Sequence, residues 1–188
     1  MNKKTSLSTR KIVFAALMAS LTVAGSAIRI TLPVDIAGTT SFHLGNIMCA
    51  LSGILLGPWL GGLAAGLGSA LYDMMNPLYI SEAWITFLTK AAYGLVPGLI
   101  AWTGKRWNYG KAAFAAAGGA ITYAALYLGK TYFYSGRFLQ GLNHEAALIA
   151  VVSKLPATSF NAVVAILFAP VLAVAIRKAL EQNHLTLE

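Results

Sequence analysis

Charged side chains are scarce in this chain of 188 residues. Only 11% of the residues are charged and six are acidic, whereas apolar residues make up 57%. A soluble domain carries about 25% charged residues, so this composition excludes an ordinary soluble protein. Together with a mean hydropathy of +0.67, it indicates an integral membrane protein. We expect residues 1–188 to form a single helical membrane domain, since this length leaves no room for a second one.

Cysteine and histidine are nearly absent as well. The chain has one cysteine, Cys49, which excludes an internal disulfide. The three histidines, His43, His144 and His184, are scattered without the spacing of metal ligands. We therefore expect neither a metal site nor a cofactor.

The signatures of enzymes are missing too. Gly129-Lys130-Thr131 resembles the end of a phosphate-binding loop, but Ala124 stands where that loop needs its first glycine, and no strand precedes it. Ser69 has no histidine on a facing helix, and Asp73 has no second aspartate within the apolar spans, so intramembrane protease chemistry is not indicated. We expect a protein that is not an enzyme and has no ATP site of its own.

The positive charges that are present gather at three places. They occupy the start of the chain, a segment in its middle and a segment near its end: Lys3, Lys4, Arg10, Lys11; Lys105, Arg106, Lys111; Arg177, Lys178. Because cytoplasmic loops carry the excess of lysine and arginine, both termini and the middle segment are expected in the cytoplasm. These residues flank apolar stretches, which favours a role in membrane topology over nucleic-acid binding.

Apolar stretches between the basic clusters predict an all-α protein with six transmembrane helices. A span needs about 17–25 residues. The 17 uncharged residues Ile12–Ile28 are longer than the core of a usual signal peptide, so we expect them to stay in the protein as a span. The 29 uncharged residues Leu44–Tyr72 are predicted to form two helices that meet at Gly57-Pro58. A single span there would put the middle basic cluster on the outer side, whereas two spans give an even number of crossings and keep it in the cytoplasm. The predicted spans are residues 12–28, 43–57, 59–72, 82–103, 112–129 and 146–176.

The connections on the outer side are predicted to be loops. Residues 29–42 contain Pro33, Gly38 and a Thr/Ser cluster, which are typical of a loop. A second outer loop is expected after Gly129, because Lys130, Arg137 and Glu145 interrupt the apolar pattern there. The second and third spans are short for a bilayer, so local thinning of the membrane or burial against neighbouring helices is expected.

Two lysines inside the predicted spans are candidate functional residues, since ionisable groups are costly in a membrane. At about 1.5 Å per residue, Lys90 and Lys154 each lie roughly 12 Å below the outer end of their span. Polar and aromatic companions follow at helical spacing on spans four, five and six: Glu82, Thr86 and Tyr93; Tyr123 and Tyr127; Thr158 and Asn161. These stripes predict a pocket in the outer half that binds an anionic group beside a ring or apolar body.

Other roles remain open for the same residues. Lys90 can pair with Glu82 or Asp73, Lys154 can extend its ammonium group towards the outer surface, and the tyrosines can anchor the protein at the membrane interface. The further candidate ligand residues are Trp84, Asn46 and three residues of outer turns, for which a turn or capping role is the alternative: Asp35, Asp73 and Asn76.

Small residues recur every fourth position in several spans, which lets helices pack closely in lipid. In the first span, Ala15 and Ala19 follow the basic pair Arg10-Lys11. This arrangement resembles the first helix of the substrate-binding (S) components of energy-coupling factor (ECF) vitamin importers. The segments from Phe42 to Asn46 and from Leu55 to Gly62, and Asn161 followed by Ala169-Pro170, are similar to later helices of that family.

The resemblance implies a division of labour. An S component binds a vitamin or related micronutrient from outside, docks on a membrane coupling subunit, and releases its ligand inside when two cytoplasmic ATPases drive it. By this resemblance Ala15 and Ala19 form the docking face, residues 31–42 form a lid, and spans four to six contact the ligand. The expected location is a prokaryotic plasma membrane.

The resemblance leaves the substrate open. The lysines are compatible with pantothenate, folate or another acid, and a flavin also remains open, whereas a biotin-type S component is expected to show a different loop pattern. Two other functions also remain: a stand-alone secondary transporter, which usually shows inverted repeats, and a membrane protein with a structural or assembly role. No convincing internal repeat is found in the chain.

Overall fold

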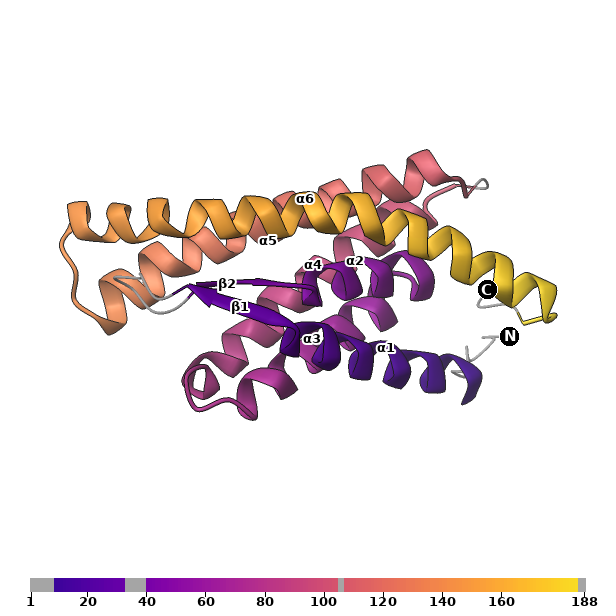
Figure 1. Cartoon of the computed structure of the whole chain (residues 1–188), viewed down its shortest axis with the longest axis horizontal. Coiled ribbons are helices and arrows are strands. Elements are labelled where there is room, and N and C mark those ends of the chain that lie inside the picture. The colour runs from indigo at the N-terminus through magenta and orange to yellow at the C-terminus, as the bar shows by residue number, and fades with distance from the viewer. Residues whose placement is uncertain (1–8, 33–39, 105–106, 186–188) are drawn as a thin grey trace, which may run out of the picture.

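The computed structural model describes residues 9–32, 40–104 and 107–185, and these form a bundle of helices with one short β-ribbon (Figure 1). The elements follow the chain in this order: α1 (Thr9–Ala27), β1 (Arg29–Leu32), β2 (Thr40–His43), α2 (Gly45–Leu56), α3 (Pro58–Met74), the 3₁₀ turn η1 (Ile80–Glu82), α4 (Ala83–Trp102), α5 (Tyr109–Lys130), the π-helix η2 (Thr131–Leu139) and α6 (His144–Gln182). The helical fold class expected from the sequence is therefore confirmed.

The short helix α2 is the centre of the bundle. Every residue of α2 except Met48 is buried, and α2 contacts α1, α3, α4, α5 and α6. Its 12 residues rise only about 18 Å, which is too short to cross the bilayer alone. The surrounding helices bury this segment inside the bundle. This is the burial that the sequence predicted for the second span.

Four helical segments in the described part of the chain are long and apolar enough to cross a membrane: Thr9–Ala27, Ile80–Trp102, Tyr109–Leu139 and His144–Gln182. The helices α2 and α3 are shorter, so the count of six spans stays a prediction. The start of α1, the end of α4, the start of α5 and the end of α6 lie at one end of the bundle, and the β-ribbon lies towards the other (Figure 1). For the basic residues that the structure describes, namely Arg10, Lys11, Lys111, Arg177 and Lys178, this arrangement agrees with the predicted grouping, while the side of the membrane they face stays a prediction.

The segment predicted as a loop over residues 29–42 contains the two strands. They pair antiparallel, with Arg29 opposite His43 and Leu32 opposite Thr40. The prediction was wrong here because threonine and serine were taken as loop formers, whereas β-branched threonine and aromatic phenylalanine also favour strands. Pro33, Asp35 and Gly38 fall outside the described residues, as does most of the predicted lid.

The fifth and sixth helices run further than predicted. Instead of a loop after Gly129, α5 continues into the π-helix η2 and ends at Leu139. The charge of Lys130 was taken as a sign of a loop, but Lys130 pairs with Glu82 inside the bundle, so the helix continues past it. Helix α6 has 39 residues and rises about 58 Å, so it extends beyond a hydrocarbon core of about 30 Å.

Glycines bring α2, α3 and α4 into backbone contact. A Cβ atom on Gly94 of α4 would lie 2.6 Å from the carbonyl oxygen of Gly61 of α3. A Cβ atom on Gly53 of α2 would collide with the carbonyl of Gly94, and one on Gly98 would collide with Pro58. The close packing predicted from the small-residue rows of spans three and four is confirmed, and it places α4 directly against the central helix α2.

This packing predicts a specific loss of stability. We expect Gly94→Ala to lower the free energy of unfolding by about 1–3 kcal/mol, because overpacking forces backbone shifts. Gly129→Ala is the matched control, because a Cβ atom there meets nothing within 4 Å and alanine favours a helix. Thermal unfolding of both variants in detergent measures the effect, and an equal melting temperature for Gly94→Ala and the unchanged protein would contradict the packing.

Candidate functional site

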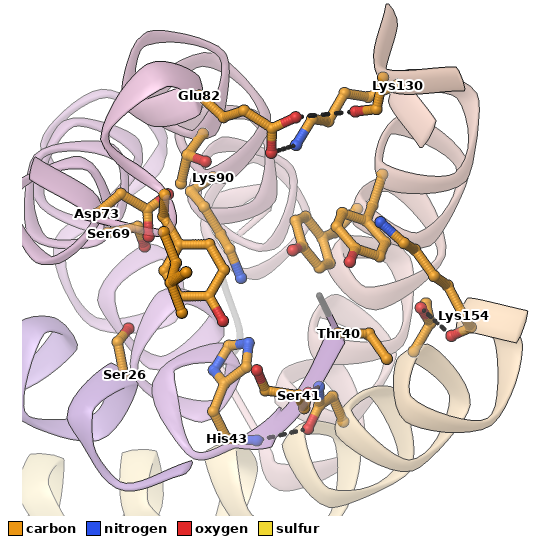
Figure 2. A pocket seen from close by; sticks show the side chains of 18 of the residues that line it. Ser26, Thr40, Ser41, His43, Ser69, Asp73, Glu82, Lys90, Lys130 and Lys154 are labelled. Carbon is orange, nitrogen blue, oxygen red and sulfur yellow. Dashed lines mark hydrogen bonds and ion pairs between the residues drawn. The ribbon is translucent and has the colours of Figure 1, made fainter. Parts of the chain in front are cut away.

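A cavity of about 340 Å³ opens among the ends of the helices beside the β-ribbon (Figure 2). Its wall is made by the end of α1, both strands, α3, the η1–α4 segment, α5, η2 and α6. The first and last contributors, Ser26 and Asn161, are far apart in sequence, so the site exists only in the folded bundle.

Most of the residues predicted to meet a ligand lie in the wall of this cavity. They come from α3, α4, α5 and α6: Asp73, Thr86, Lys90, Tyr123, Tyr127, Lys154, Thr158 and Asn161. The three polar stripes predicted for spans four, five and six therefore converge on one space.

Three other candidates in the described part of the chain do not line the cavity. The side chain of Trp84 is 55% exposed and packs edge-to-face on Tyr134. The Asn76 side chain accepts a hydrogen bond from the backbone N–H of Leu78 (3.0 Å), which is a turn role. Asn46 is buried behind the wall, where it contacts Lys90, and Asp35 lies outside the described residues.

Lys90 is buried with neutral partners. Its side chain is 4% exposed, its ammonium group donates a hydrogen bond to Asn46 Oδ1, and Nζ lies 3.8 Å from the ring centroid of Tyr123. Within the described residues the single ion pair joins Lys130 and Glu82, so the pairing of Lys90 with Glu82 that the sequence allowed is not formed. Lys90 thus presents a positive charge at the cavity without a direct ion pair to a carboxylate of the described residues.

Three tyrosines form a stack beside this charge. The ring centroids of Tyr93 and Tyr123 are 5.1 Å apart and those of Tyr123 and Tyr127 are 5.6 Å apart, with nearly parallel planes. The ammonium nitrogen of Lys154 lies 5.5 Å from the Tyr127 centroid. Because Tyr93 is fully buried, the stack belongs to the interior and is not an anchor at the membrane interface.

The π-helix η2 brings Ser135 to the ion pair of Glu82 and Lys130, and the sequence analysis did not predict this contact. The Glu82 carboxylate accepts hydrogen bonds from Lys130 and from the Ser135 hydroxyl (2.9 Å for the latter). The wider π turn brings residues five apart to a common side, so Lys130 and Ser135 reach the same carboxylate. Turns of π-helix occur often at functional sites. No local sequence pattern predicts where they form, so this contact could not be found from the sequence.

Arg29 of β1 was also missed. Its guanidinium carbon lies 4.2 Å from the ring centroid of Tyr72 and 4.9 Å from that of Tyr79, and its Nε donates to the Ser26 carbonyl (2.8 Å). These contacts join the ribbon to the α3–α4 turn. An arginine directly after an apolar span was visible in the sequence, and treating residues 29–42 as a loop concealed its place in the wall.

Asn161 holds the opposite edge of the ribbon. Its Oδ1 accepts a hydrogen bond from the backbone N–H of His43 (3.0 Å), and its Nδ2 donates to the Ser41 carbonyl (2.8 Å). The neighbouring Phe160 packs edge-to-face on Phe42 at 4.8 Å between ring centroids. A two-stranded ribbon is marginal by itself, so these contacts to α6 fix the strand that presents Thr40, Ser41 and His43 to the cavity.

The electrostatic balance of the wall is positive. Among the described residues that line the cavity, four are cationic and two are acidic: Arg29, Lys90, Lys130, Lys154; Asp73, Glu82. Inside a water-poor bundle such an excess attracts anions more strongly than it would in water. The arrangement is suited to holding a small anionic molecule beside aromatic rings.

Comparison with known proteins identifies a family from one match and a shared fold from another. The family model described as "ECF-type riboflavin transporter, S component" matches residues 6–178. The crystal structure of an S component for biotin from an ECF-type ABC transporter superposes with a TM-score of 0.59 at 15% identity, covering 89% of this chain and 94% of that one. This likeness shows a shared fold.

A curated relative comes from Pyrococcus woesei. It is described as an "uncharacterized protein in gap 3'region", and it is 33% identical over 118 residues, which are 62% of this chain and 74% of the relative. The family match extends over nearly the whole chain and includes every element that lines the cavity. This chain therefore belongs to the family of S components of ECF-type riboflavin transporters.

Proposed function

We propose that the protein is the substrate-binding membrane subunit of an ATP-driven ECF importer, and that it holds a vitamin or related micronutrient with an anionic group in the cavity. The family and the shared fold support the subunit's role as a binding component. The ligand enters from the outer side and leaves on the inner side after the protein docks on a coupling subunit.

The observation that carries the proposal is the buried ammonium group of Lys90. An ammonium removed from water is costly unless an opposite charge or several hydrogen bonds compensate it. In this structure the compensation comes from one amide oxygen and tyrosine faces. An anionic ligand group completes it, with Lys154 contributing a second positive charge across the tyrosine stack.

The family description names riboflavin and the structural relative binds biotin, so the substrate must be argued from the wall of this cavity. Riboflavin carries no formal charge, whereas the wall has more cationic than acidic side chains. We therefore place acids first. A flavin is the second candidate, because the parallel rings of Tyr123 and Tyr127 offer aromatic faces beside the cavity.

The remaining subunits supply energy and a path to the inside. We propose a membrane coupling subunit and two cytoplasmic ATPases as partners, in a prokaryotic plasma membrane. The predicted docking residues Ala15 and Ala19 are half-buried and pack against the core. The exposed small residues of α1 include Ala16, Ser20 and Ala24, which follow one another at every fourth position. We therefore centre the docking face on these three, with Ala15 and Ala19 at its edge.

Removing the charge of Lys90 tests the binding proposal. A hydrogen bond to a charged group contributes about 1.5–3 kcal/mol, so Lys90→Met should weaken binding of an acid about tenfold or more. Isothermal titration calorimetry with pantothenate, folate, biotin and riboflavin measures this effect on the purified protein. Lys178→Met is the control, since Lys178 is exposed near the end of α6.

An acid that binds equally to the unchanged protein and to Lys90→Met would contradict this assignment of Lys90. Uptake of the ligand by the isolated chain, without ATPases, would instead favour a stand-alone secondary transporter. If no vitamin binds, the structural or assembly role gains support.

A second prediction concerns docking. Ala16→Trp should leave ligand affinity and melting temperature unchanged and should abolish uptake in cells that contain the coupling subunit and the ATPases, because a large ring prevents close helix packing. Ala19→Trp should also lower the melting temperature, since α1 packs on α3 where Gly68 meets Ala19. Ile121→Trp, at a site that is 70% exposed on α5, controls for an added surface tryptophan. Normal uptake by Ala16→Trp would show that docking uses another face.

A further inference from the structure

The cavity has two chemically different sides. In Figure 2, Asp73, Ser69 and Ser26 lie on one side, Lys154 lies on the other, and Lys90 lies between them. The first side offers hydroxyl groups and a carboxylate, which accept hydrogen bonds. The second side offers ammonium groups and tyrosine rings, which favour an anion beside an apolar or aromatic body.

Asp73 is engaged by a neutral partner. The side-chain hydroxyl of Thr86 hydrogen bonds to its carboxylate, and no lysine or arginine of the described chain forms an ion pair with it. Arg29, which shares the cavity wall, directs its guanidinium at the rings of Tyr72 and Tyr79. Asp73 therefore presents acceptor capacity to the cavity.

Lys90 and Asp73 line the same cavity, yet they do not form an ion pair. Lys130 and Glu82, in the same wall, do form one. Opposite charges attract more strongly in a protein interior than in water, so Asp73 and Lys90 influence one another although their side chains stay apart. Their separation leaves a positive and a negative group available to different ends of one ligand.

We propose that the ligand is a hydroxylated organic acid, whose acid group binds at Lys90 and whose hydroxyl groups bind at Asp73 and the adjacent serines. This inference rests on the proposed function and specifies its substrate class. A carboxylate receives strong hydrogen bonds from hydroxyl donors. A cationic amine is disfavoured at Asp73, because four cationic side chains line the same cavity.

The arrangement also rejects related molecules. An acid without hydroxyl groups would cover Asp73 and leave its carboxylate short of hydrogen-bond donors. A site that is built to bind a hydroxyl group discriminates strongly against an analogue that lacks it. A neutral polyol would satisfy Asp73 and leave the charge of Lys90 without an anion. Both groups are satisfied together when the ligand carries an acid and a hydroxyl.

The test compares two hydroxylated acids, pantothenate and riboflavin 5′-phosphate, with two hydroxyl-free acids, lipoate and nicotinate. Calorimetry on the full chain should show at least one hydroxylated acid binding about tenfold or more tighter than both hydroxyl-free acids. Asp73→Asn should reduce this preference, Asp73→Leu should abolish it, and neither should weaken the hydroxyl-free acids. Glu181→Gln, which removes an exposed acid near the end of α6, should change nothing.

The outcomes separate the two proposals. If a hydroxyl-free acid binds as tightly as both hydroxylated ones, or if Asp73→Asn weakens all bound acids alike, the hydroxylated-acid inference is overturned and anion binding at Lys90 stands. If none of the four acids binds to a folded protein with an unchanged melting temperature, both proposals are overturned.

Discussion

The positive charge of Lys90 inside the bundle is the constraint around which the site is organised. Its neutral partners come from two different helices: Asn46 from α2 and Tyr123 from α5. Asn46 can reach Lys90 because α2 is enclosed by protein, and α4 approaches α2 because Gly53 and Gly94 carry no side chains at their contact. Backbone packing at the glycines thus determines where the charge lies.

The end of the bundle that contains the cavity depends on polar contacts between segments that are distant in sequence. Arg29 joins the ribbon to the α3–α4 turn, and Asn161 joins it to α6. The Glu82–Lys130 pair links the start of α4 to the end of α5. These contacts hold together segments that form the cavity wall, so its shape depends on a few charged and amide groups. The opposite end of the bundle holds the start of α1 and the end of α6 (Figure 1), where Arg10, Lys11, Arg177 and Lys178 stand in the sequence.

The sequence predicted the part of the site that lies on long helices. Lys90 with Thr86, and Lys154 with Thr158, follow helical spacing, and tertiary packing then brings those faces together. The contacts of Asn161 could not be predicted, because its partners lie about 120 residues away and no local pattern encodes them. The ribbon was missed because threonine and serine are common in both loops and strands. The sequence also left open which small residues of α1 are exposed, because they occur on more than one of its faces; in the structure Ala16 is exposed and Ala15 is half-buried.

The central claim is that the cavity holds an anionic small molecule beside Lys90. The most direct measurement is native mass spectrometry of the detergent-purified protein, followed by identification of any molecule that co-purifies with it. The account predicts a bound mass of vitamin size whose released molecule carries an acid group. A bound molecule without an acid group, retained at the same occupancy when Lys90 is replaced by methionine, would contradict it.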